Sequence, residues 1–224
     1  MIIDNTYLRG ELYIPHAKPG ITDDVTEVDG AVTDFIEEYV AECLLKCLGY
    51  DLYREFSLVL DKAESNGLVD GSPIKWDQLL NGHVYTDPNS GKTIAWRGIR
   101  YEAIPDGGYN KSFLANYVYY FYEKDDYITR SDAGHQILNA ANAENVLPTA
   151  KVTRAWNKMV DMIQGANNNP LYGYKNGMPW VDHFNQNNQE VSLSKFIKDS
   201  NAILDETYAN YTPQVFSKLN AFGL

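Results

Sequence analysis

The chain has 224 residues, of which 44% are hydrophobic, and its formal net charge at pH 7 is −11. A hydrophobic share of this size is typical of a folded globular protein and excludes a largely disordered chain. No cluster of Lys and Arg stands out, which argues against a nucleic-acid-binding protein, because such proteins carry a basic patch.

Residues 1–27 are predicted to form an extended N-terminal arm, because Pro15, Pro19 and Gly20 interrupt helix formation. The arm is expected to lie on a neighbouring molecule or along its own core. Its first residues do not have the pattern of a signal peptide. No stretch of the chain is long and apolar enough to predict a membrane span, and we expect no membrane partner.

A helix is predicted over residues 28–48, where apolar residues recur three and four positions apart. Gly49 follows, as glycine commonly does after a helix. A second helix is predicted over residues 50–64, so that the two form a hairpin. The apolar stripe of the first helix consists of Val28, Val32, Phe35, Ile36, Tyr39, Val40, Cys43, Leu44, Cys47 and Leu48.

The only two cysteines, Cys43 and Cys47, share a face of the first helix. Because no histidine or further thiol lies near them in the sequence, we predict neither a zinc site nor a disulfide. A short helix is predicted after Pro73. A β-hairpin follows, in which residues 83–86 and 93–96 flank a segment dense in turn residues.

The helix predicted from Ser112 to Lys124 is apolar or aromatic almost all round, which is typical of a helix buried on every side. We therefore expect a mainly α fold, a helical bundle around this central aromatic helix. Its tyrosines are interpreted as core residues whose hydroxyls find partners or the surface. A base-stacking platform is the alternative, but it would also need a basic groove. Asn110 or Ser112 is expected to cap the helix.

Residues 125–147 are predicted to form a long loop, and loops of this length are commonly functional. A helix from Pro148 to Ile163 follows. Residues 164–189 are rich in Asn and Gly and contain aromatic residues, which either dock on a partner or cover the core. A last helix is predicted over residues 192–208, and Phe216, Leu219 and Phe222 form an apolar tail. We divide the chain into residues 1–27, 28–163 and 164–224.

The sequence contains few candidate catalytic groups. The four histidines, at positions 16, 83, 135 and 183, are scattered and do not converge with other groups. The segment Gly91-Lys92-Thr93 resembles the end of a phosphate-binding loop, but the upstream glycine is missing and a hairpin turn explains it better. We therefore predict no enzyme, no metal site and no cofactor.

Several short segments, taken in order along the chain, carry a resemblance to a known family. They include Phe35-Ile36-Glu37-Glu38-Tyr39, Lys75-Trp76-Asp77-Gln78-Leu79-Leu80, Ala115-Asn116-Tyr117-Val118-Tyr119-Tyr120 and Pro148-Thr149-Ala150-Lys151-Val152-Thr153-Arg154-Ala155-Trp156. Over roughly residues 28–163 the chain resembles a family of virion proteins from tailed phages of Bacteroidetes, crAss-like phages included. Members of that family are taken to be head-to-tail connectors, also called adaptor or ring proteins.

The resemblance implies a helical subunit of a homo-oligomeric ring, usually of 12 copies, at the portal–tail junction of the virion. The ring would bind the portal protein and neighbouring tail or ring proteins, and DNA would pass through it without sequence-specific binding. It implies no catalytic residues. Acidic helix faces in such a channel would repel DNA phosphates and keep the DNA mobile.

Two segments are predicted to contact neighbours in such a ring. Residues 129–146 are expected to order against the next subunit or the portal. The second segment, which contains Tyr172, Tyr174, Trp180 and Phe184, is expected to contact a neighbouring ring. The predicted contact residues are Thr129, Arg130, His135, Ile137, Leu138, Tyr172, Tyr174, Trp180 and Phe184. The alternatives are another tail or capsid structural protein, and a hydrolase built on the scattered histidines and acids.

Overall fold

The computed structural model describes residues 2–14, 26–61, 67–89, 91–101, 111–126, 128–131, 134–137, 149–165, 190–203 and 207–220. Their elements, in chain order, are the 3₁₀ turns η1 (Asn5–Tyr7) and η2 (Gly10–Leu12), then α1 (Thr26–Leu48), α2 (Tyr50–Ser57), α3 (Ile74–Asn81), β1 (His83–Thr86), β2 (Thr93–Trp96), α4 (Phe113–Asp126), β3 (Ile128–Ser131), β4 (Gly134–Ile137), α5 (Thr149–Gln164) and α6 (Leu193–Ile203). The prediction of a mainly α fold is confirmed.

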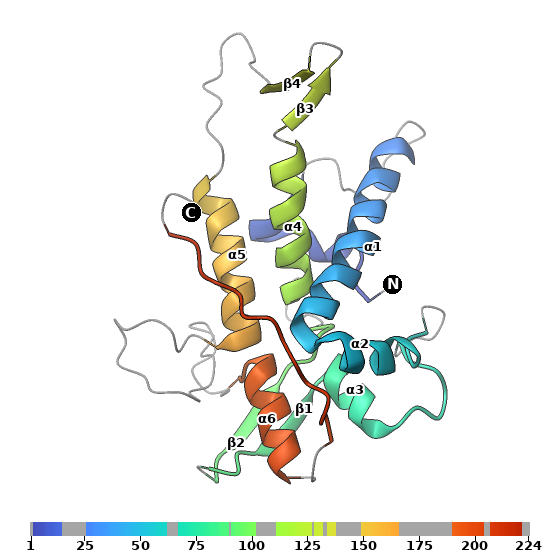
Figure 1. Cartoon of the computed structure of the whole chain (residues 1–224), viewed down its shortest axis with the longest axis vertical. Helices are drawn as coiled ribbons and strands as arrows, with labels where there is room; N and C mark the ends of the chain where they lie inside the picture. Colours follow the sequence, from blue (N-terminus) through green and yellow to red (C-terminus); the bar gives the residue numbers. More distant parts are fainter. Residues whose placement is uncertain are drawn as a thin grey trace.

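Helix α4 is the centre of the bundle. It lies between α1 and α5 and packs on both (Figure 1). Residues 112–119 are all buried, so the first turns of α4 are covered on every side. The expectation of a central aromatic helix is therefore confirmed, because the segment is apolar or aromatic apart from Ser112 and Asn116, whose side chains hydrogen-bond to the backbone.

Ser112 caps α4, as one of the two residues proposed for this role. Its Oγ accepts a hydrogen bond from the N–H of Leu114 at 3.1 Å and donates one to the carbonyl of Ile99 at 2.7 Å. The first contact satisfies a backbone donor that has no partner within the helix. The second fixes the start of α4 against the segment that follows β2.

Helix α1 buries most of the predicted stripe from Val32 to Leu48, whereas Phe35 and Tyr39 are half-buried. Helix α2 is shorter than predicted and ends at Ser57. The chain leaves the helix because backbone pairing competes with it: the N–H of Val69 donates to the carbonyl of Val59 at 2.9 Å, and that of Asp61 to Gly67 at 3.0 Å. This pairing depends on residues six and ten positions away, so the local pattern did not indicate it.

The short helix and the first hairpin lie where the sequence predicted them. Helix α3 buries Trp76, Leu79 and Leu80. Strands β1 and β2 pair antiparallel from His83 opposite Trp96 to Thr86 opposite Thr93. The indole N–H of Trp96 donates to the carbonyl of Leu79 at 3.0 Å and joins the two elements.

Helix α6 ends at Ile203, earlier than the predicted residue 208. Tyr208 lies in a turn instead, where its N–H donates to Oδ1 of Asn201 at 2.6 Å and its hydroxyl to the carbonyl of Lys75 at 2.6 Å. Side-chain capping by Asn201 thus replaces further helix. The ring of Phe196 stacks on Trp96 at a centroid distance of 5.7 Å, so that α6 covers the hairpin β1–β2.

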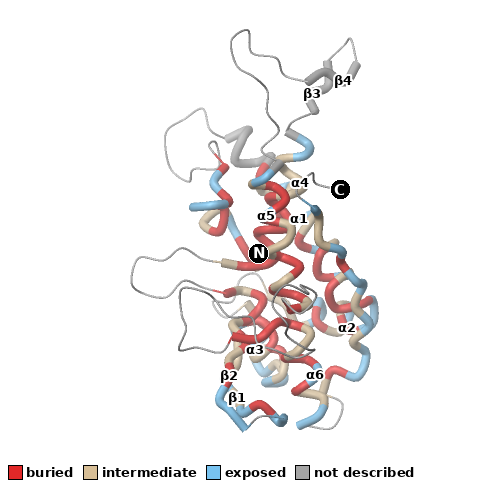
Figure 2. The backbone as a smooth tube through the Cα atoms, turned by 90° about the vertical axis from the view of Figure 1, so that its left-hand side faces the viewer, coloured by how far each residue is buried: buried red, intermediate tan, exposed pale blue. Residues whose placement is uncertain are grey.

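The remaining described segments pack on the same core. Residues 2–14 lie along the molecule's own core, with Ile3, Tyr7, Leu8, Leu12 and Ile14 buried. Figure 2 shows buried residues continuing from α4 and α5 to α3 and β2, and they form one cluster. Within the predicted loop of residues 125–147, α4 extends to Asp126 and the hairpin β3–β4 follows it.

Candidate functional site

The predicted contact residues are only partly within the described chain. Thr129 and Arg130 lie on β3, and His135 and Ile137 on β4; Arg130 is opposite His135 in the register. Leu138, Tyr172, Tyr174, Trp180 and Phe184 lie outside the described residues. The hairpin places four of the nine residues on one ribbon that follows the C-terminal end of α4 (Figure 1).

The described residues contain no group of three His, Cys, Asp or Glu side chains placed to hold a metal ion. His83 stacks on the ring of Tyr85, with centroids 5.9 Å apart. The sulfurs of Cys43 and Cys47 are 3.7 Å apart, well beyond an S–S bond, and both thiols are free. Burial raises the pKa of the Cys43 thiol well above its ordinary value, which keeps it protonated and unreactive.

No described helix is both long enough and apolar enough to cross a membrane. A cleft of about 300 Å³ opens between Ile2, α1 and the segment after α2. Its walls are mainly apolar, with Ile36, Val40 and Leu44 from α1. Nothing in the described chain indicates what would fill this cleft.

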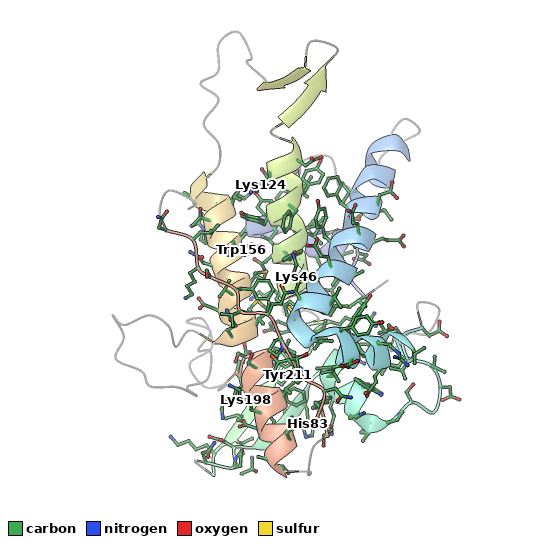
Figure 3. The ribbon with its side chains drawn as sticks, in the orientation of Figure 1. Lys46, His83, Lys124, Trp156, Lys198 and Tyr211 are labelled. Carbon is green, nitrogen blue, oxygen red and sulfur yellow. The ribbon has the colours of Figure 1, made fainter. Side chains whose placement is uncertain are left out.

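Two helices on opposite sides of α4 carry opposite charge. Helix α1 contains six acidic residues and one lysine, a formal charge of −5. Asp34, Glu37 and Glu38 are exposed, whereas Glu42 pairs with Lys46 in the next turn. Lys46 also donates to the hydroxyl of Tyr117 at 3.0 Å and so points towards α4 (Figure 3).

Helix α5 contains three basic residues and one acidic residue, a formal charge of +2. Lys151, Arg154 and Lys158 are three and four positions apart, so they form one stripe along the helix. Arg154 is exposed, and Lys158 lies 3.6 Å from Glu11. The spacing of these three cations is visible in the sequence, but the stripe was not predicted, because no basic cluster stood out.

The C-terminal tail, residues 207–220, crosses the face of the molecule from α6 towards α5 (Figure 1). Phe216 is buried and contacts Trp156 of α5, with ring centroids 6.0 Å apart. Trp156 also contacts Tyr120 of α4 at 4.5 Å, and Figure 3 shows it between the two helices. The prediction that Phe216 belongs to an apolar tail is confirmed, and the tail covers the chain's own helices.

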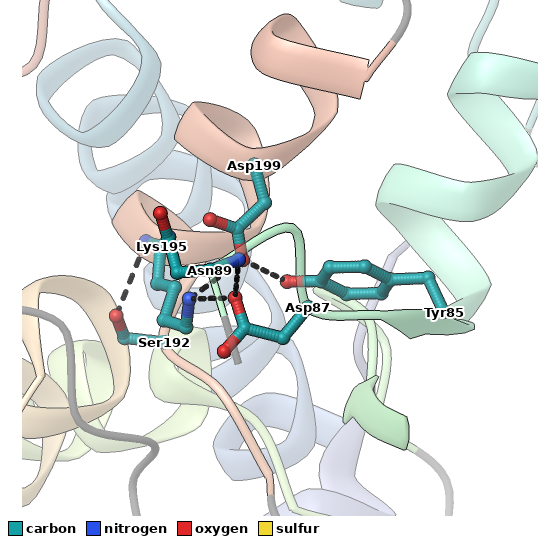
Figure 4. A network of polar contacts seen from close by, with 6 residues as sticks. All are labelled: Tyr85, Asp87, Asn89, Ser192, Lys195 and Asp199. Atoms are coloured by element: carbon teal, nitrogen blue, oxygen red, sulfur yellow. Dashed lines mark hydrogen bonds and ion pairs between the residues drawn. The ribbon is translucent and has the colours of Figure 1, made fainter. Parts of the chain in front are cut away.

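A buried polar network joins the hairpin β1–β2 to α6 (Figure 4). Nζ of Lys195 lies 3.1 Å from Oδ1 of Asp87 and 2.8 Å from Oδ2 of Asp199, and Tyr85 donates to the same oxygen of Asp199 at 2.8 Å. Burial alone would lower the pKa of Lys195, but hydrogen bonds to Asp199 and Asp87 raise it above its ordinary value. The lysine therefore stays charged and neutralises one of its two partners.

A second ion pair joins β2 to the segment before α6. Nε of Arg97 donates to Oε1 of Glu190 at 2.6 Å, and Arg97 lies over the ring of Tyr101. The N–H of Val191 donates to the carbonyl of Ala95 at 2.9 Å, which adds a backbone link. Each carboxylate of the two networks is held by a cation, so we interpret both as structural connections rather than catalytic groups.

Comparisons with protein-family models, curated proteins and solved structures find no match for this chain. Function is therefore argued from the chain's own residues. The geometry offers two charged faces, one on each side of the bundle, and a tail that spans the distance between them.

Proposed function

We propose that this chain is a subunit of a head-to-tail connector ring of a tailed phage, which joins the portal to the tail and extends the DNA channel. The resemblance over residues 28–163 supports this function. A mainly helical subunit agrees with it.

The observation that carries the proposal is the opposite charge of α1 and α5 on the two sides of α4. A cyclic ring requires two unlike faces that are complementary to each other, since each copy contacts the next head to tail. An acidic face on α1 and a basic stripe on α5 meet this requirement. A twofold dimer would instead bring a face against its own copy and place like charges together.

The charge balance also suits a DNA channel. The whole chain carries a formal charge of −11. Pairing α1 of one subunit with α5 of the next would occupy Arg154, the exposed cation of α5, and the ring remains strongly acidic. Such a channel repels phosphates and lets DNA pass without being held.

Native mass spectrometry over a range of protein concentrations tests the oligomeric state. A large closed ring would support the connector function. A stable twofold dimer would contradict it, because matching faces leave nothing to close a ring. If the protein is a monomer, the same measurement is repeated with portal protein added.

Charge reversal tests the two faces. We expect Asp34→Lys/Glu38→Lys on α1, or Arg154→Glu/Lys158→Glu on α5, to raise the subunit concentration needed for ring formation about tenfold or more, since like charges then face each other. Combining all four changes should restore assembly, because the faces are again opposite in charge.

The control is Asp51→Lys/Asp70→Lys, which changes the net charge as much as the α1 variant but alters exposed residues outside α1. It should leave ring formation unchanged. Failure of the fourfold variant to recover, in a protein that melts at the wild-type temperature, would show that α1 and α5 do not meet in the ring.

A further inference from the structure

The tail is attached at two places. The first attachment joins its backbone to the backbone of α1, and the second joins it to side chains of α5. Its first part is bound to the C-terminal end of α1: the N–H of Thr212 donates to the carbonyl of Leu48 at 3.2 Å, and that of Gln214 to the carbonyl of Lys46 at 2.8 Å. These carbonyls lie in the last turn of the helix, where they have no partner within it. The tail therefore completes the end of α1.

The second part, residues 216–219, is the strap, and it is bound by side chains of α5. Nε2 of Gln164 donates to the carbonyl of Phe216 at 2.7 Å, and Oε1 of Gln164 accepts from the N–H of Phe216 at 3.2 Å. Asn157 holds Leu219 in the same way, at 2.9 and 2.8 Å. Two amides thus each hold both backbone groups of one strap residue.

Two further contacts bind the strap to α5, one to its backbone and one to a side chain. The indole N–H of Trp156 donates to the carbonyl of Ser217 at 2.8 Å, and Lys218 lies 2.5 Å from Asp161. Recognition is mainly of the backbone, as when an extended peptide adds to a sheet edge. Phe216 supplies the apolar anchor.

A single residue separates the two attachments. Val215 is 83% exposed, and Gln214 before it is also exposed. Backbone rotation at Val215 redirects the strap without disturbing the attachment to α1, and the buried side chain of Phe216 moves with it. The strap can therefore leave α5 as a unit while the first part of the tail stays in place.

We propose that, in the assembled ring, the strap of each copy lies on α5 of the neighbouring copy. This inference rests on the proposed function, in which α1 of one copy faces α5 of the next. The strap starts from the end of α1, so the neighbour's α5 is available to it in the same way as its own. The same hydrogen bonds form in either position, which makes the exchange low in cost.

The length of the strap limits this arrangement. The five residues from Val215 to Leu219 span at most about 17 Å when extended, at roughly 3.4 Å per residue. The neighbour's Asn157 and Gln164 must lie within that distance of the end of α1. In a closed ring every copy both gives and receives a strap, and the high local concentration of the neighbour favours exchange.

Crosslinking tests the exchange. The double variant Asp161→Cys/Lys218→Cys is treated with a short bismaleimide under the condition that gives rings, with portal protein where the ring needs it. Cys43 and Cys47 are fully buried, so the two new thiols are the ones that react. Exchange links different chains and yields a covalent ladder on a denaturing gel, whereas a strap on its own α5 yields internally linked monomers.

A second pair of variants shows whether the amides carry the contact. Adding Asn157→Ala/Gln164→Ala should lower the yield of linked chains at least tenfold, while Asn210→Ala, which removes a contact of the tail to Glu55 outside the strap, should not. Circular dichroism melting verifies that each variant is folded.

The outcomes separate the two proposals. Rings by native mass with only internally linked monomers would overturn the exchange and leave the connector function standing. A ladder that stops at two chains, in a protein that forms no ring, would support the exchange and contradict the ring. A ladder that reaches the mass of the ring supports both.

Discussion

At the scale of the residue, burial decides what a charged pair contributes. Lys195 and Asp199 are four positions apart on α6, and their side chains are 10% and 7% exposed. Lys46 and Glu42 have the same spacing on α1, at 30% and 38% exposure. Water screens the second pair and is largely excluded from the first, so loss of one partner leaves buried polar groups without their hydrogen bonds only in α6.

We therefore expect Asp199→Ala to lower the free energy of unfolding by about 2 kcal/mol, because the hydroxyl of Tyr85 loses its acceptor and Lys195 loses one of its two carboxylate partners. The matched variant Glu42→Ala should cost about 0.5 kcal/mol. Urea unfolding at pH 7 measures both values. Equal costs for the two variants would show that the α6 network is as hydrated as the surface pair.

At the scale of the element, α3 and the end of β2 approach each other backbone to backbone. A Cβ on Gly98, whose φ is +91°, would lie 2.5 Å from the carbonyl oxygen of Leu80. A Cβ on Gly82, with φ +104°, would lie 2.7 Å from that of Trp96. Hydrogen bonds from Ile99 and Arg100 to the carbonyls of Leu79 and Leu80 hold this contact together.

The expected cost of Gly98→Ala is about 3 kcal/mol or more of unfolding free energy, because a methyl group would have to displace backbone in addition to adopting a strained φ. Gly71 has φ +76° but open space around the position of its Cβ. Gly71→Ala should therefore cost only the strain, about 1 kcal/mol. Thermal unfolding of both variants measures the difference, and similar melting temperatures would contradict the close approach.

Elements with a strong local signal were predictable. The hairpin β1–β2, α3 and the apolar stripe of α1 follow from periodicity and turn residues, and the structure confirms them. The ends of α2 and α6 could not be predicted, because they depend on tertiary contacts: the pairing of Val59 with Val69 and the capping by Asn201. Of the surfaces proposed for ring contacts, the basic stripe of α5 was visible in the spacing of its cations.

The binding of the strap had no sequence signal. Asn157 and Gln164 each hold a residue more than fifty positions away, and they do so through that residue's backbone, which has no sequence pattern. A side-chain amide on a helix is ordinarily a surface residue, so only the structure distinguishes these two. The nine residues predicted to contact partners stay a prediction.

At the scale of the whole molecule, one core joins the bundle, the hairpin β1–β2 and the tail, and tyrosines lie at its junctions. Tyr85 links β1 to α6, Tyr208 links the tail to α3, and Tyr117 links α4 to α1. Burial raises the pKa of each of these phenols above its ordinary value, and for Tyr85 the nearby Asp199 carboxylate raises it further.

This common direction predicts a loss of stability at alkaline pH. A buried phenol keeps its proton in the folded state, whereas the unfolded chain releases it near pH 10. The stabilisation is complete below pH 10 and is lost as pH rises towards the folded pKa, at about 1.4 kcal/mol per pH unit for each tyrosine. Lys195, whose pKa is also raised, changes stability in the same direction.

Tyr208 isolates one such contribution, because its side chain is 1% exposed. We expect Tyr208→Phe to be less stable than the wild type at pH 8 by about 1 kcal/mol, through loss of its hydrogen bond to Lys75. Above pH 10 its unfolding free energy should fall less steeply, by about 1.4 kcal/mol per pH unit. Urea unfolding from pH 8 to 11 measures both effects. Tyr50→Phe, which alters a side chain that is 66% exposed, should keep the wild-type slope. If Tyr208→Phe kept that slope as well, the Tyr208 phenol would have to ionise equally readily in the folded and unfolded chains. Water would then have access to Tyr208 between the tail and the core.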